Sequence, residues 1–380
     1  MSDLTENENE LSTAALSQWQ LIRLRFSRHL LARSSLFVLV VLYLVALFAE
    51  VIAPYTSGWR DIGQAYCPPQ LPAISFGHGL HVKAMKRHVD PITLKRYYIE
   101  APDEIMPLGF FVRGVPYKLW GLIPMDRHFL GIDLSRVPIS GDADQVSATF
   151  YFLGADKYGH DLFSRIIYGA RISLTIGLVA IVITFFLGII IGGISGYYGG
   201  IVDTLIQRSI EVINSIPHLP MWLAIGASMP ADWPALRTYF AITIVLSALG
   251  WTGLARVVRG KILSLREEDY AMAARLIGAS HARVMFRHLV PGFASHIIVA
   301  LTLSVPGMIL GETALSFLGL GLRPPVVSWG VLLQDTINLE VVANYPWLIT
   351  PVFLIIVTVL SFNFLGDGLR DAADPYGHTG

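Results

Sequence analysis

The sequence has little charge and almost no cysteine. Only 15% of its 380 residues are charged, whereas 53% are hydrophobic, and its 28 basic residues are balanced by 28 acidic ones. An apolar share above half is unusual for a soluble domain, and a zero net charge argues against a nucleic-acid-binding surface, which needs a clustered basic excess. The one cysteine, Cys67, cannot form a disulfide within the chain. A lipid bilayer is therefore the expected solvent.

Common catalytic motifs are also missing. The chain has no Walker A string (G-x-x-x-x-G-K-[ST]), because Gly260-Lys261 lacks both the following Ser or Thr and the upstream glycine. Neither H-E-x-x-H nor G-x-S-x-G occurs. We therefore expect no enzyme activity, no bound cofactor and no metal site in this chain. Three histidines, His78, His81 and His88, fit no standard metal-ligand spacing and are expected to be solvated.

Long apolar stretches are abundant. A helix needs roughly 20 mostly apolar residues to cross about 30 Å of hydrocarbon. Because Pro217 and Pro220 interrupt the third such stretch, we expect a broken helix there. The sequence predicts an all-α polytopic membrane protein whose six spans lie at 35–53, 172–195, 207–228, 238–257, 295–318 and 346–366.

Basic residues near the span ends predict the orientation. Four arginines precede the first span, and seven basic residues lie in the loop 256–293, so both segments are expected in the cytoplasm. No small-residue cleavage site follows the first span, which favours an uncleaved anchor. The predicted organisation is a cytoplasmic N-terminal segment, an anchor helix, a proline-rich extracytoplasmic subdomain, a five-helix core and a cytoplasmic tail, at 1–34, 35–53, 54–171, 172–367 and 368–380.

Four glycines at spacing four end the second predicted span. Gly188, Gly192, Gly196 and Gly200 place small residues on one helix face, which lets another backbone approach closely. This pattern predicts a helix-packing seam. The contact could be within the chain, which we favour, or with a second membrane subunit.

Two acids lie in or near predicted spans. Glu211 follows Arg208 at a spacing that allows an ion pair on a helix, and Glu312 lies near the end of the fifth span. An acid within a membrane is a functional hypothesis by default. Glu312 could carry a proton or contact a cationic substrate, but a helix-capping or interhelical hydrogen-bonding role is favoured.

The loop 258–293 contains a polar-basic stretch rich in alanine, YAMAARLIGASHARVMFRHLVP at 270–291. We expect a helix through Ala271 to Ile277, an end at Gly278 because glycine tolerates left-handed backbone, and a new short helix from Ser280. Such a helical elbow suits docking of another protein. The alternative is a membrane-surface helix held by its arginines against anionic lipid.

This loop resembles the coupling loop of the integral membrane permeases of ATP-binding-cassette importers, specifically the second permease of the peptide, opine and nickel group. The family pattern is Glu-Ala-Ala, three residues, Gly, nine residues, Ile, one residue, Leu, Pro. Met272, His288 and Val290 replace its Glu, Ile and Leu, and the missing glutamate weakens the case for a specific ion pair to the ATPase. The coupling loop that the resemblance implies includes Ala273, Ala274, Gly278, Ala279 and Pro291.

Other segments extend the resemblance over roughly 150–376. LGADKYGHDLFSRIIYGARISL at 153–174 is similar to the family's segment before the second span, with Gly159 and Asp161 retained and His160 where an arginine is usual. GETALSFLGLGLRPPVVSWG at 311–330 and GDGLRDAADP at 366–375 are likewise similar. The region from 54 to about 150 is longer than expected for the family, and its function stays open.

The resemblance implies the type I importer permease fold and half of a translocation path for peptides or related small solutes. The implied partners are a second homologous permease, one or two ATPase subunits that bind ATP and Mg, an extracytoplasmic solute-binding protein and membrane lipid, with no nucleic acid. The implied location is the bacterial inner membrane. The alternatives are a secondary transporter that uses Glu211 or Glu312, and a membrane-anchored assembly protein whose external loop is the working part.

Overall fold

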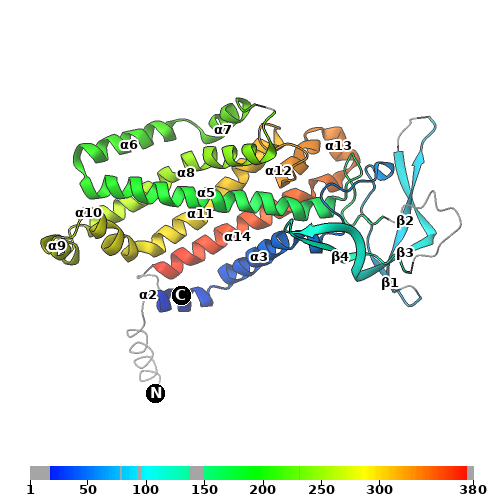
Figure 1. Ribbon diagram of the computed structural model, residues 1–380, viewed down its shortest axis with the longest axis horizontal. Helices are drawn as coiled ribbons and strands as arrows, with labels where there is room; N and C mark the ends of the chain where they lie inside the picture. Colours follow the sequence, from blue (N-terminus) through cyan, green and yellow to red (C-terminus); the bar gives the residue numbers. More distant parts are fainter. Residues whose placement is uncertain (1–17, 78, 93–95, 137–148, 231, 375–380) are drawn as a thin grey trace, which may run out of the picture. The chain divides into compact units, whose positions relative to one another are not determined.

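The computed structural model describes residues 18–77, 79–92, 96–136, 149–230 and 232–374 (Figure 1). The chain divides into two compact units. One consists of Met1–Val40, Ile176–Gly311 and Ile356–Gly380, and the other of Val41–Thr175 and Glu312–Ile355.

Helices dominate the described chain. In the N-terminal part they are α2 (Gln18–Arg28), α3 (Leu30–Leu47) and α4 (Ala49–Ile52). The remaining helices are α5 (Leu162–Tyr198), α6 (Gly200–Ser215), α7 (His218–Ala227), α8 (Ala235–Leu265), α9 (Asp269–Leu276), α10 (His281–Arg283), α11 (Ala294–Phe317), α12 (Trp329–Leu332), α13 (Leu339–Asn344) and α14 (Thr350–Ala373).

Five helical stretches in the described residues are long and apolar enough to cross a membrane: Leu30–Leu47, Leu162–Tyr198, Ala235–Leu265, His281–Phe317 and Pro346–Ala373. They coincide with five of the six predicted spans. The remaining predicted span, 207–228, is the third along the chain. It is divided between α6 and α7, so the count of six stays a prediction.

The break between α6 and α7 lies where the prolines predicted it. Ile216 and Pro217 both have extended backbone, with ψ of 126° and 127°. A proline has no backbone N–H to donate and disfavours helical geometry in the residue before it. The helix therefore ends at Ser215 and a new one begins at His218.

The prediction of an all-α protein is wrong between α4 and α5. This region forms a four-stranded antiparallel sheet in the order β1-β2-β3-β4, with strands Ala73–Ser75, Gly79–Val89, Arg96–Leu119 and Ile123–Ile132. Charged and apolar residues mix along these strands, so no helical or spanning pattern marks them in the sequence. One face buries an apolar cluster of Val82, Ala84, Ala101, Met106, Leu108, Ile132 and Phe150.

Three of the four glycines predicted to form a seam lie against α8. A Cβ added at Gly188 would lie 2.6 Å from Leu254, and one at Gly196 would lie 2.8 Å from the carbonyl oxygen of Arg259. Gly192 is equally close to the Ala255 backbone, whereas Gly200 begins α6 and faces open space. Gly188, Gly192 and Gly196 therefore face α8 of the same chain and Gly200 does not, while a packing role of the four-glycine seam stays a prediction.

Candidate functional site: a helical elbow and a polar entry segment

The loop after α8 folds into the predicted elbow. The helix α9 begins after the extended Glu268 with Asp269 in its first turn, and it carries Arg275 in its last turn, which complements the helix dipole. Gly278 has a left-handed φ of 87°, and the Ser280 hydroxyl then accepts a hydrogen bond from the Arg283 N–H to cap α10. A π-helical turn, Val284–Leu289, and a 3-10 turn, Val290–Phe293, lead into α11. The predicted helix, glycine and second helix are thus confirmed.

The inner face of the elbow is apolar and buried. Ala271 and Val284 are fully buried, and Leu289 and Phe293 continue the same surface. These residues share one core with side chains of α5, α8 and α11, among them Ile189, Tyr197, Leu254, Val258, Ile262 and Ile297. Burial of this much apolar surface is the main force that holds the elbow in place.

Polar contacts fix the elbow to the end of α5. Arg266 donates to the carbonyl oxygens of Gly196 and Tyr197, at 3.1 and 3.2 Å. Arg275 donates to the Arg266 carbonyl at 2.8 Å and lies over the Tyr197 ring, 5.2 Å from its centroid. The Tyr197 hydroxyl lies 3.0 Å from Nδ1 of His281. Both arms of the elbow therefore contact the same tyrosine.

A charged pair braces α8 close to the elbow. Asp203 of α6 accepts two hydrogen bonds from Arg259, each 2.5 Å long, and a third from the Ser195 hydroxyl. Gln207 donates to the same hydroxyl at 3.0 Å. Because a two-point guanidinium–carboxylate pair is geometrically specific, these contacts link α5, α6 and α8.

The outer face of the elbow is apolar and exposed. Leu276 is 89% and Ile277 87% exposed, and Met272 is 42% exposed. Gly278 follows them with open space where a side chain would be. We call Met272, Ala273, Leu276, Ile277 and Gly278 the outer patch. The alanine pattern alone does not reveal this exposed apolar face. The sequence signal for it is a pair of consecutive large apolar residues at the end of a short helix in a polar loop.

The predicted coupling residues divide between the two faces. Ala273 and Gly278 are exposed on the outer patch, whereas Ala274 and Ala279 are half-buried against the core beneath it. Pro291 is exposed in the 3-10 turn that enters α11. Of the three positions that depart from the family pattern, Met272 is on the outer patch, while His288 and Val290 are half-buried.

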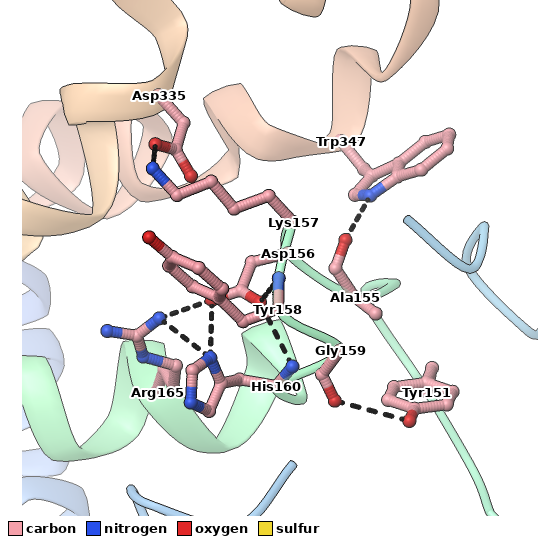
Figure 2. Close-up of polar contacts among 10 residues, drawn as sticks. All are labelled: Tyr151, Ala155, Asp156, Lys157, Tyr158, Gly159, His160, Arg165, Asp335 and Trp347. Carbon is pink, nitrogen blue, oxygen red and sulfur yellow. Dashed lines mark hydrogen bonds and ion pairs between the residues drawn. The ribbon is translucent and has the colours of Figure 1, made fainter. Parts of the chain in front are cut away.

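A second cluster forms in the segment 153–165 that precedes and begins α5, which we call the entry segment. Figure 2 shows Asp156 between Arg165 and His160. Its carboxylate is paired with Arg165, lies 2.8 Å from Nδ1 of His160, and accepts backbone N–H groups from Tyr158 and His160 at 2.8 and 3.0 Å. Asp156 and Arg165 are both buried.

More distant residues complete this cluster. Lys157 forms an ion pair with Asp335 at 2.8 Å, and the Trp347 indole N–H donates to the Ala155 carbonyl at 3.0 Å (Figure 2). Gly159 has a φ of 77°, and a Cβ there would overlap the carbonyl oxygen of Asp61. The glycine that the family resemblance singled out is thus required by a close backbone approach.

The two aspartates of the entry segment have opposite electrostatic surroundings. Burial alone would raise the pKa of Asp156, but the hydrogen bond from His160 and the charge of Arg165 outweigh it and hold that pKa below its ordinary value. Burial raises the pKa of Asp161 to about 7, although the Ser164 hydroxyl and N–H donate to its carboxylate.

The two acids considered for transport lie in different settings. Glu211 is exposed and pairs with Arg208 at 2.6 Å, as their spacing predicted. Glu312 is fully buried in α11 and accepts hydrogen bonds from the hydroxyls of Ser328, Ser316 and Ser173, at 2.7, 2.8 and 3.3 Å. The Glu312 contacts fit the favoured interhelical hydrogen-bonding role.

The histidines of the inserted region make ordinary contacts where the structure describes them. His81 lies 2.9 Å from the Gly79 carbonyl and His88 stacks on Tyr97, while His78 is outside the described residues. His81 is buried, contrary to the expectation that it is solvated. Among the described residues, no group of three His, Cys, Asp or Glu side chains could hold a metal ion.

Comparison with known proteins gives two family matches. Residues 186–376 match the family described as "Binding-protein-dependent transport system inner membrane component", and residues 17–69 match "N-terminal TM domain of oligopeptide transport permease C". The elbow lies inside the first match. The sheet lies between the two.

Individual relatives agree with these matches. The chain is 41% identical over 59% of its length to a dipeptide transport system permease protein of Bacillus subtilis, of which it covers 68%. It is 38% identical over 62% of its length to an oligopeptide transport system permease protein of the same organism, covering 74% of that protein. It is 39% identical over 67% of its length to the Escherichia coli oligopeptide transport system permease protein, covering 81% of it.

Proposed function

Because this chain belongs to the family of binding-protein-dependent transport system inner membrane components, we propose that it is a permease subunit of an ATP-binding-cassette importer for peptides or related small solutes. The similar proteins named as dipeptide and oligopeptide permeases support the solute class. In this role the chain contributes half of the translocation path, and a second homologous permease contributes the other half.

The outer patch is the docking surface for a partner ATPase. Its exposed Leu276 and Ile277 are the single observation that carries this assignment, because large apolar side chains at the tip of a polar elbow gain most when a partner covers them. Since Met272 stands where the family has a glutamate, apolar contact rather than an ion pair holds the ATPase here.

The inner face transmits the movement. ATP and Mg bind in the ATPase subunits, and closure of those subunits displaces the docked elbow as a rigid body. The Tyr197 contacts with Arg275 and His281, together with the shared apolar core, pass that displacement to α5 and α8. The spans then tilt between inward-open and outward-open states.

The predicted topology places the remaining partners. With the six predicted spans, both termini and the elbow are cytoplasmic in a bacterial inner membrane, and the segment 54–171 faces outward, toward an extracytoplasmic solute-binding protein that delivers the solute. Five apolar helices in the described residues support the multi-pass arrangement.

The experiment is a charge inserted into the outer patch. In the complete transporter, Leu276→Asp should reduce ATPase co-purification at least tenfold and abolish ATP-driven peptide uptake, because docking would bury an unpaired carboxylate. Leu339→Asp is the matched control, since Leu339 is 82% exposed but lies in α13, outside the elbow. Unchanged association and uptake in Leu276→Asp would overturn the proposal, as would an equal loss in Leu339→Asp.

A further inference from the structure

The β3–β4 hairpin ends in a three-residue loop, 120–122, that contains a tryptophan. The Leu122 N–H donates to the Leu119 carbonyl at 3.0 Å, which makes Trp120 and Gly121 the central residues of a β-turn within this loop. Both have positive φ, 51° and 75°. Asn-Gly is the usual choice for such a turn, and a bulky residue in left-handed backbone is strained. Something other than turn formation therefore favours Trp120.

The tip of this hairpin is fixed to the end of an apolar helix. The Trp120 indole N–H donates to the Leu47 carbonyl at 2.9 Å, and its ring lies 5.8 Å from that of Phe48. Further along β4, both ring nitrogens of the buried His128 lie against carbonyl oxygens, Ala53 at 2.6 Å and Val115 at 2.8 Å. In Figure 1, β4 accordingly runs beside the end of α3.

For α3 to cross the bilayer, its C-terminal end must lie close to the edge of the hydrocarbon. With 18 residues, α3 is about 27 Å long, close to the roughly 30 Å of a bilayer core. Arg171 marks the same level, since it pairs with Glu50 at 2.6 Å and donates to the Ala46 and Leu47 carbonyls. A charged side chain at the end of a span is stable where headgroups and water begin.

The side chains at the tip suit that boundary. Leu122 is 79% and Ile123 51% exposed, and Trp120 and Lys118 are exposed beside them, with no acidic residue in the tip 118–124. Tryptophan concentrates at membrane interfaces, and a lysine there can extend its ammonium to lipid phosphates. We infer that the tip 118–124 is a membrane anchor, with Leu122 and Ile123 in the outer edge of the acyl region and Trp120 at the headgroups.

This anchor belongs to the inserted region rather than to the family's common core. The tip lies between the two matched segments, 17–69 and 186–376. It would fix the sheet at a set height and orientation on the membrane next to the first span. The inference needs only that α3 crosses the bilayer, so it can fail or hold independently of the solute and of ATPase docking.

The test measures lipid exposure at the tip. In the complete transporter, a Cys67→Ala chain carrying Leu122→Cys receives a nitroxide label, with no other reactive cysteine in the complex. Power-saturation spectroscopy in nanodiscs of phosphatidylethanolamine and phosphatidylglycerol then compares collisions with oxygen, which partitions into lipid, and with a water-soluble nickel complex. Ile92→Cys is the matched control, because Ile92 is a 90% exposed apolar residue at the turn after β2.

We expect the oxygen-to-nickel ratio to be several-fold higher at Leu122 than at Ile92. Equal nickel access at the two positions would overturn the inference, because the tip would then be in water. A label shielded from both reagents would also overturn it, since a protein partner would then cover the tip. Ile123→Cys provides a second position in the same tip should Leu122→Cys impair assembly.

Discussion

The elbow and the entry segment both lead into long apolar helices, α11 and α5, but they are held by opposite means. The elbow rests on a buried apolar core and leaves Leu276 and Ile277 exposed. The entry segment encloses the buried charges of Asp156 and Arg165 and ties them to backbone and side-chain partners. Apolar packing with an exposed apolar face suits a surface that binds a partner, whereas a buried network of ion pairs and hydrogen bonds fixes one local geometry.

The largest expected loss of stability follows from removing the carboxylate at the centre of the entry segment's polar network. Asp156→Ala leaves Arg165 buried without its carboxylate and should cost about 3–5 kcal/mol of stability. Lys157→Ala removes a half-exposed pair with Asp335 and should cost about 1 kcal/mol or less. The thermal unfolding midpoint of the purified transporter checks both. Similar midpoints for the two variants would contradict the structural role assigned to Asp156.

The glycines of the two regions sharpen the comparison. Gly278 and Gly159 both have left-handed backbone, where an alanine costs roughly 1–2 kcal/mol. Gly278→Ala meets open space and should lose only that amount, while Gly159→Ala must also displace the chain at Asp61, for about 1–3 kcal/mol more. The thermal unfolding midpoints of the two variants test this difference. A lower midpoint for Gly278→Ala than for Gly159→Ala would refute the claim that a close backbone approach requires Gly159.

The smallest effect concerns pH. Asp161 ionises near 3.8 when unfolded but at about 7 when folded, so the folded chain holds an extra proton between these values and its stability falls as pH rises through them. Asp161→Asn, which retains a helix-capping side chain, should remove this decline and unfold at a higher temperature than the parent above pH 7. Parallel unfolding profiles from pH 5 to pH 8 would show that Asp161 titrates normally.

The sequence predicts the elbow well because its determinants are local. Alanines at helical spacing, Gly278 and Ser280 specify a helix, a left-handed end and a new cap within about a dozen residues, and the structure has these elements. The break at Pro217 is local in the same way. Hydropathy alone predicts the five spans that the described residues contain. The span predicted at 207–228 does not form one long apolar helix.

The remaining features depend on contacts between distant residues. Lys157 pairs with Asp335, and Trp347 donates a hydrogen bond to Ala155, although more than 170 residues separate the partners in the sequence. No rule of sequence spacing predicts such pairs. The sheet escaped prediction because β3 alternates charged, aromatic and proline residues without a clean period of two. The exposure of Leu276 and Ile277 cannot be predicted from the sequence, because exposure of a side chain depends on where the rest of the chain packs.

The most direct measurement of the central claim is site-specific photo-crosslinking from the outer patch. A photoreactive phenylalanine analogue replaces Ile277 in the complete transporter, and the same analogue at Leu339 is the control. The account predicts a covalent adduct between position 277 and the ATPase subunit, and none with that subunit from position 339. Adducts from position 277 that contain only lipid, or no adduct in an actively transporting complex, would contradict it.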